Sequence, residues 1–159
     1  MASSTPATRM LERAGVRFAL HVYDYDPDAD KIGLHAAQSL GVSAQAMLKT
    51  LIVRVDGQLA CVLLPSDREA SMKKVAVAFE AKAAEMARPQ DAERITGYRI
   101  GGVSPFGQKK RLAIVVDASA LGRPAVFVNG GQRGLQIELE PVDLVTALQA
   151  RTADIVQSG

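Results

Sequence analysis

The chain has 159 residues, of which 48% are hydrophobic and 23% charged, so it is long enough to bury an apolar core. Nineteen Lys and Arg against seventeen Asp and Glu leave a formal charge of only +2, which excludes nucleic-acid binding by a strong overall positive field. No segment approaches the roughly 18 consecutive apolar residues of a membrane span, and no signal-peptide pattern opens the chain. We therefore expect a soluble, cytoplasmic protein without membrane contact, formed by one domain over residues 1–159.

The first forty residues predict a helix, a strand and a second helix. Thr5 followed by Pro6 has the residue types of a helix N-cap and first helical position, and Gly15 ends this helix. Alternating apolar residues over 16–22 predict a half-buried strand. After an Asp-rich connection, residues 34–40 predict a short helix that a glycine caps.

The clearest local signal is the dipeptide Asp56-Gly57, which separates two apolar runs at 49–55 and 58–64. Both central residues of a type I′ turn need positive φ, and Asp-Gly meets that need well. The sequence therefore predicts a β-hairpin at this point.

The second half of the chain mixes helices and strands without strict alternation. Helical spacing of apolar residues predicts helices over 72–79, 90–95 and 142–150. Short β-rich runs predict strands over 112–116, 125–128 and 135–139. Residues 81–86 fit neither pattern clearly. This arrangement predicts an α/β fold of the mixed α+β type, with a largely antiparallel or mixed sheet.

Lys49 stands at the start of the first hairpin strand, on the same side as Leu51 and Val53, which is the side we expect the strand to bury. An unpaired buried ammonium is costly, so such a lysine must find an anion, shift its pKa or keep its head in water. The pattern alone leaves two interpretations: a strand end whose lysine head stays in water, and a functional cation.

Two glycine-rich loops could bring backbone N–H groups close to a ligand. The first covers residues 101–107 and the second covers 129–134, with the basic triplet Lys109-Lys110-Arg111 between them. Exposed N–H groups can hold a phosphate or a developing oxyanion. Neither loop has the dinucleotide or Walker pattern, so each also fits a tight turn, and the triplet fits either a phosphate contact or a solvated strand end.

The histidines His21 and His35 and the single cysteine, Cys61, have no metal-ligand spacing. Cys61 cannot form an internal disulfide and lies inside an apolar run, so we expect a buried structural thiol rather than a nucleophile. His21 is expected to be a partly buried strand histidine rather than a general base. We therefore predict neither a metal nor a cofactor.

Four segments in order resemble the YbaK family of free-standing aminoacyl-tRNA editing domains, which is related to a domain associated with prolyl-tRNA synthetase. They are H-V-Y at 21–23, L-K-T-L-I-V at 48–53, T-G-Y with G-G-V-S-P-F-G-Q-K-K-R within 96–111, and V-N-G-G-Q-R-G-L at 128–135. Each motif is weak alone, but their order and spacing match across nearly the whole chain.

This resemblance implies a compact mixed α/β domain around a barrel-like sheet flanked by helices. It also implies hydrolysis of the ester between a wrong amino acid and the 3′-terminal adenosine of tRNA, with cysteine on the proline tRNA as the typical substrate. The family chemistry needs no protein nucleophile, because the substrate thiol attacks its own ester carbonyl with a large effective molarity. We expect a monomer that acts on the 3′ acceptor end of aminoacyl-tRNA, with prolyl-tRNA synthetase as a candidate partner.

The matching positions also imply roles for individual residues. Lys49 would fix the terminal nucleotide or the ester, and Tyr23 would line the same pocket, which makes these two the catalytic candidates. The substrate-binding candidates are Ile32, Thr50, Gly101, Gly102, Ser104, Pro105, Asn129, Gly130, Gly131 and Gln136. The candidate tRNA phosphate contacts are Lys109, Lys110, Arg111 and Arg133.

Several pocket positions depart from the cysteine-specific branch of the family. Ile32 replaces a common aromatic residue, Leu34-His35 replaces an acidic pair, Asn129 replaces a serine, and Gln136 replaces a short polar or acidic residue. These departures leave the amino acid more open than the reaction. The alternatives are a deacylase for another small amino acid and a non-catalytic module that binds the tRNA end or a synthetase. A nucleotide hydrolase would need a carboxylate set for Mg²⁺ near the loop, which the sequence does not provide.

Overall fold

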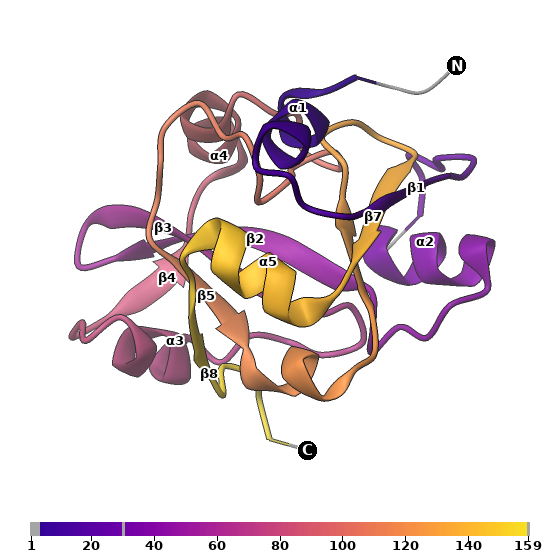
Figure 1. Cartoon of the computed structure of the whole chain (residues 1–159). Coiled ribbons are helices and arrows are strands. Elements are labelled where there is room, and N and C mark those ends of the chain that lie inside the picture. The colour runs from indigo at the N-terminus through magenta and orange to yellow at the C-terminus, as the bar shows by residue number, and fades with distance from the viewer. Residues whose placement is uncertain (1–3, 30, 159) are drawn as a thin grey trace.

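A computed structural model describes residues 4–29 and 31–158, whose strands form two β-sheets (Figure 1). The smaller sheet is antiparallel with the order β1 (Ala19–Val22), β7 (Leu135–Leu139), β6 (Val126–Asn129). The larger has the order β4 (Ala84–Met86), β2 (Leu48–Val55), β3 (Gln58–Pro65), β5 (Ile114–Asp117), β8 (Arg151–Ala153). Its β2-β3 and β2-β4 pairs are antiparallel, whereas β3-β5 and β5-β8 are parallel, so the predicted mixed sheet is confirmed.

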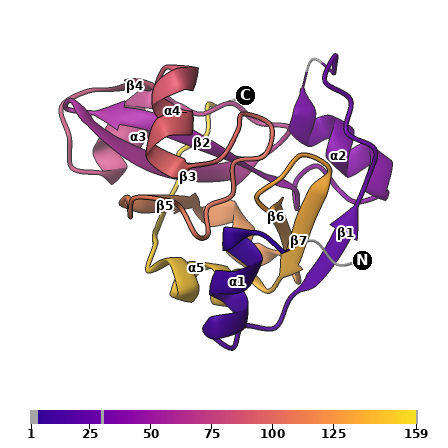
Figure 2. The same ribbon diagram turned by 90° about the horizontal axis from the view of Figure 1, so that it is seen from above.

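The helices lie on both sides of these strands. They are α1 (Pro6–Arg13), α2 (Ile32–Leu40), α3 (Met72–Ala78), α4 (Pro89–Thr96), α5 (Pro141–Leu148) and the short 3₁₀ helix η1 (Ala118–Gly122). Figure 2 shows α1 and α5 on one side of the molecule and α3 and α4 on the other, with strands between them. No helix in the described ranges is long and apolar enough to cross a membrane.

The structure confirms the helix start, the hairpin turn and the helix end that the sequence predicted from neighbouring residues. Thr5 and Thr8 form a reciprocal capping box at the start of α1. The turn residues Asp56 and Gly57 have φ values of 47° and 83°, as a type I′ hairpin requires. Gly97 ends α4 with a φ of 81°.

Other boundaries and elements differ from the prediction. The strand expected over 16–22 begins only at Ala19, where pairing with β7 begins, and α2 already begins at Ile32. The unassigned segment 81–86 contributes β4, whereas β8 and η1 were not predicted at all. Each of these strands is three or four residues long and is defined by its partner rather than by its own pattern.

The expected barrel-like sheet is wrong in one respect, because the described strands do not close into a barrel. The two sheets meet through a parallel bridge between Met47 and Phe127, where Phe127 N–H donates to the carbonyl of Ala46 at 2.9 Å. This bridge joins the beginning of β2 to β6 and leaves the rest of each sheet separate. It also fixes the position of Lys49 relative to the second glycine-rich loop.

Both faces of β2 are buried, which corrects the expectation of a single buried side. Ile52 belongs to the larger apolar cluster between the two sheets, together with Leu11 of α1 and Leu144 of α5. Val53 belongs to a second cluster, which α3 covers with Val75. A central strand between two covered faces therefore places its alternating side chains in two different apolar environments.

Candidate functional site

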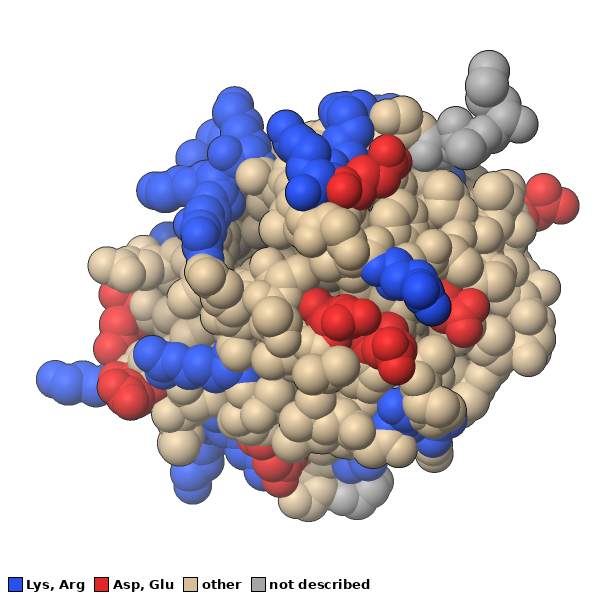
Figure 3. Space-filling view, in the orientation of Figure 1, with Lys and Arg blue, Asp and Glu red and all other residues tan. Residues whose placement is uncertain are grey.

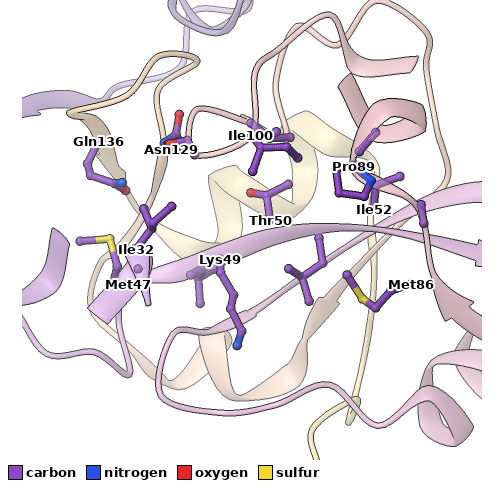
Figure 4. Close-up of a pocket in the computed structure, with 17 residues that line it drawn as sticks. Ile32, Met47, Lys49, Thr50, Ile52, Met86, Pro89, Ile100, Asn129 and Gln136 are labelled. Carbon is purple, nitrogen blue, oxygen red and sulfur yellow. The ribbon is translucent and has the colours of Figure 1, made fainter. Parts of the chain in front are cut away.

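A cavity of about 340 Å³ opens beside the first half of β2 (Figure 4). It lies between that strand, α4 and the first glycine-rich loop, and the ends of β6 and β7 close it on the far side. Its lining residues are Ile32, Gly33, Met47, Leu48, Lys49, Thr50, Leu51, Ile52, Met86, Ala87, Pro89, Ala92, Ile100, Gly101, Val103, Asn129 and Gln136. The lining is mainly apolar with a few polar groups, which is typical of a small-molecule site.

Lys49 and Thr50 leave β2 on opposite sides, as alternating strand residues must (Figure 4). Thr50 points toward the glycine-rich loop, and its hydroxyl is buried without a hydrogen-bond partner among the described residues. The ammonium of Lys49 points away from that loop and lies 3.7 Å from Oε1 of Glu69. The cavity therefore touches the backbone and stem of Lys49 more closely than its charge.

Glu69 is shared by two lysines, because Nζ of Lys31 lies 3.6 Å from the same carboxylate oxygen that Lys49 approaches. The side chain of Lys49 is 22% exposed, and burial lowers its pKa. Glu69 raises this pKa, and the positive charge of Lys31 lowers it further. The negative charge of Asp67 also raises this pKa, so the Lys49 ammonium is influenced by two carboxylates and one further ammonium.

Two buried polar side chains lie beside each other behind the cavity. Tyr23 is 7% exposed, its ring meets that of His35 edge-on, and its hydroxyl has no hydrogen-bond partner in the described part of the chain. Burial raises the pKa of Tyr23, and the neighbouring Gln136 opposes this shift. Gln136 lines the cavity, and its Oε1 likewise has no partner among the described residues. Tyr23 itself does not belong to the lining.

Asn129 connects the two glycine-rich loops. Its Nδ2 donates to the carbonyl of Gly101 at 3.0 Å, and its Oδ1 accepts from the N–H of Gly131 at 2.8 Å. Gly102 brings the same loops into contact, since a Cβ there would lie 3.0 Å from the backbone of Gln132 and Arg133. The side-chain amide of Asn129 is therefore engaged on both sides, and it holds the cavity wall in place.

Five substrate-binding candidates lie outside the cavity lining, namely Gly102, Ser104, Pro105, Gly130 and Gly131. Ser104 is fully buried, and its hydroxyl accepts from the N–H of Phe106 at 3.2 Å. Pro105 lines a different hollow, beside α5. The carbonyl of Gly130 accepts from the Thr5 hydroxyl at 2.5 Å. For all five, contact with a substrate stays a prediction.

Comparison with known proteins follows this geometry. The model of the aminoacyl-tRNA editing domain family matches residues 26–147, which includes β2, α4 and both glycine-rich loops. The chain belongs to the aminoacyl-tRNA editing domain family.

Relatives of this editing domain agree with the match. The chain is 33% identical over 156 residues to a protein of Enterococcus faecalis named as a candidate Cys-tRNA(Pro)/Cys-tRNA(Cys) deacylase, covering 95% of this chain and 92% of that protein. It is 32% identical over 94 residues to the proline-tRNA ligase of Geobacillus thermodenitrificans, covering 59% of this chain but only 16% of the ligase.

Solved structures show the same fold. A protein described only as hypothetical has a TM-score of 0.85 at 27% identity, with 96% of this chain and all of that chain covered. A candidate trans-editing enzyme for prolyl-tRNA synthetase has a TM-score of 0.80 at 23% identity, with 98% and 100% covered. Because the trans-editing enzyme is only 23% identical, its similarity to this chain shows a shared fold and no more.

The basic residues of this editing domain that we predict as tRNA phosphate contacts lie in two places. Lys109, Lys110 and Arg111 are exposed, and the N–H groups of the two lysines donate to the carbonyls of Thr96 and Ile95 at the end of α4. Figure 3 shows Lys and Arg side chains gathered over α4 and the segment that leads to β5. Arg133 lies at the first glycine-rich loop, where its Nε donates to the carbonyl of Ile100 at 3.0 Å.

The histidine and cysteine interpretations agree with the structure. His21 contacts Glu138 across the β1-β7 pair at 2.8 Å, away from the cavity lining. Cys61 is fully buried, which raises the pKa of its thiol to about 12. No group of three or more His, Cys, Asp or Glu in the described ranges could hold a metal ion.

Sequence reasoning missed the apolar wall that α4 and β4 supply. Met86, Pro89 and Ala92 line the cavity together with Ile100, and none carries a local motif. It also missed Glu69, the partner of Lys49, because the two residues are brought together only by the path of the chain after β3. A search for carboxylates near the predicted lysine in space, rather than in sequence, would have found it.

Proposed function

We propose that this editing domain hydrolyses Cys-tRNA(Pro) in trans, with the thiol of the substrate attacking its own ester. The observation that carries this proposal is the composition of the cavity. Among its lining residues Lys49 alone is titratable and Thr50 alone carries a hydroxyl. Lys49 is paired with the exposed carboxylate of Glu69, which is not in the lining, and the Thr50 hydroxyl has no hydrogen-bond partner among the described residues. A pocket built in this way supplies shape and polarity but no activated protein nucleophile.

The proposed chemistry is balanced without a cofactor. The substrate sulfur bonds to the ester carbonyl carbon, and the C–O bond to the tRNA ribose breaks. The ribose oxygen takes up the proton that the thiol loses, and water then opens the resulting cyclic thioester to free cysteine. Holding the thiol near attack geometry replaces a positioned base, because an intramolecular nucleophile has a large effective molarity.

The geometry supports different tasks for the polar groups. The Lys49 ammonium lies on the side of β2 away from Thr50, which favours a contact with the phosphate of the terminal nucleotide over one with the ester. The side-chain amide of Gln136 lines the cavity beside Tyr23 and suits a polar group such as the α-ammonium of the amino acid. The first glycine-rich loop, which Asn129 holds through Gly101, would face the reacting carbonyl.

A comparison of substrates tests this proposal. Cysteinyl-, seryl- and alanyl-tRNA(Pro) with the same tRNA body should be incubated with the protein, and the loss of the ester should be followed. We expect the cysteinyl ester to react at least about tenfold faster than the seryl ester, because a thiol ionises more readily and is the better nucleophile near neutral pH. Equally fast loss of the alanyl ester, which has no side-chain nucleophile, would contradict the thiol mechanism and favour a deacylase for another small amino acid. No loss of any ester would favour a non-catalytic binding module.

Cys61 should be dispensable for this reaction. Its thiol is fully buried in the core and lies outside the cavity lining. We expect Cys61→Ala to lower the free energy of unfolding by about 1–2 kcal/mol through a small cavity. The rate of cysteinyl-ester loss should stay within about twofold of the parent, measured at a temperature where both proteins are folded. A folded but inactive variant would show that the thiol takes part in the reaction.

A further inference from the structure

Three arginines converge on one aspartate beside the cavity. Asp91 is 7% exposed, and its carboxylate lies 3.3 Å from Arg54, 3.1 Å from Arg88 and 3.2 Å from Arg94. Three guanidinium groups thus share a single carboxylate, and the hydrogen bonds from Arg88 and Arg94 hold the pKa of Asp91 below its usual value. We call Arg54, Arg88 and Arg94 the arginine cluster.

The arginine cluster is excessively positive for a structural ion pair. All three guanidinium groups donate to the Asp91 carboxylate, which carries a single negative charge. No other carboxylate in the described ranges forms an ion pair with them, so two of the three positive charges are not balanced by a paired anion. Glu85 lies opposite Arg54 in the register of β4, but no ion pair joins them. The side chains of Arg88 and Arg94 are 71% and 66% exposed, so an external anion can reach both.

The position of the arginine cluster connects it to the cavity along two elements. On α4, Arg88 precedes the lining residue Pro89, and Asp91 precedes the lining residue Ala92. On β2, Arg54 lies on the same face as the lining residues Thr50 and Ile52. Successive residues on one face of a strand are about 7 Å apart, so Arg54 is one such step beyond Ile52. The wall of the cavity therefore leads directly to the arginine cluster.

A second set of cations lies at the other end of α4, where Lys109 and Lys110 dock on its last carbonyls. Helix α4 has eight residues and is thus about 12 Å long. The surface over α4 is rich in Lys and Arg, whereas the whole chain carries a formal charge of only +2 (Figure 3). The positive charge is concentrated where a chain that enters the cavity would have to pass.

From this arrangement we infer that the arginine cluster is a binding site for the phosphodiester backbone of the single-stranded 3′ end of tRNA, just before the nucleotide that enters the cavity. Asp91 is a positioning residue, which holds the three guanidinium groups in one place before the RNA arrives. Guanidinium groups suit this task because their planar fork can bind phosphate oxygens in pairs. The inference rests on the proposed function and names the part of the substrate that this surface contacts.

The double variant Arg88→Gln/Arg94→Gln tests the inference, since both side chains are exposed and their loss leaves Asp91 paired with Arg54. Binding of uncharged tRNA(Pro) should be measured at several salt concentrations. We expect the slope of log affinity against log salt to fall by about 1.4, at about 0.7 per single-strand phosphate contact, and the affinity at 0.15 M salt to fall about tenfold. The matched control is Arg13→Gln/Arg17→Gln, which removes the same charge from exposed positions in and after α1, on the other side of the molecule. Equal effects of the two pairs would overturn the inference.

A minimal substrate separates this inference from the proposed function. The cysteinyl ester of adenosine alone carries no phosphodiester, so the parent and the Arg88→Gln/Arg94→Gln variant should hydrolyse it at rates within about twofold. A much slower variant would show that the arginine cluster acts on the reacting end, and would overturn the inference. A parent that binds tRNA through the arginine cluster but hydrolyses neither the small ester nor Cys-tRNA(Pro) would refute the proposed function alone.

Discussion

Replacing Lys49 with alanine should lower the rate of ester loss from Cys-tRNA(Pro) by about 10²-fold, because without its contact to the terminal phosphate the ester can shift by about 1 Å from its reacting position. The chain should stay folded, because Glu69, the partner that is left, is exposed and can be solvated by water. Lys49→Arg should restore only part of the rate, since the planar guanidinium is larger than the ammonium and directs its hydrogen bonds differently. Single-turnover hydrolysis, with circular dichroism as a check of folding, measures these effects.

Lys31→Ala is the matched control for Lys49. It removes the same charge from a lysine that is paired with the same carboxylate, Glu69, but the Lys31 side chain is 60% exposed and does not line the cavity. We expect it to change the rate by less than about threefold. If Lys31→Ala and Lys49→Ala slow the reaction equally, Lys49 acts through the general positive field and has no specific contact.

The pH dependence should carry the signature of Lys49. Burial lowers its pKa below that of an ordinary lysine, so its cationic form predominates below this lowered pKa and is lost as the pH rises through it. The rate of the parent divided by that of Lys49→Ala should therefore fall on the alkaline side. This ratio removes the increase that ionisation of the substrate thiol and free hydroxide cause in both proteins. A ratio that is constant with pH would contradict a role for the charge.

Gly102→Ala should lower kcat/KM by about 10²-fold, because it displaces the wall of the cavity. The added Cβ would lie 3.0 Å from backbone atoms of Gln132 and Arg133, which cannot turn aside as a side chain would. The two glycine-rich loops must then separate, and the hydrogen bond from Asn129 to Gly101 lengthens or breaks. A shift of about 1 Å in a catalytic wall costs rates of this order.

Gly122→Ala provides the comparison for this variant. A Cβ at Gly122 meets no heavy atom within 4 Å, and the residue lies in η1, outside the cavity lining. It should hydrolyse Cys-tRNA(Pro) like the parent. If Gly102→Ala is equally active while its thermal unfolding midpoint is unchanged, close contact of the loops is not needed for the reaction.

Short-range residue patterns predicted those features of the fold that neighbouring residues decide. Thr5 with Pro6 starts α1, and Asp56-Gly57 forms the hairpin, because capping bonds and positive φ values act within a few residues. The motif order predicted the family, and the family match at residues 26–147 confirms it.

Long-range packing decided which of the predicted residues line the cavity or contact one another. Tyr23 and Ser104 are buried outside the cavity lining, whereas Met86 and Ala92, which have no motif, form part of its wall. The second face of β2 became buried because another sheet covers it, which the period of a strand cannot indicate. The hydrogen bond from Asn129 to Gly101 joins residues 28 positions apart. In the arginine cluster, Arg54 and Asp91 are 37 positions apart. Such contacts depend on how the sheets and α4 pack together, since the side chains involved have no preference for each other until the chain has closed the distance between them.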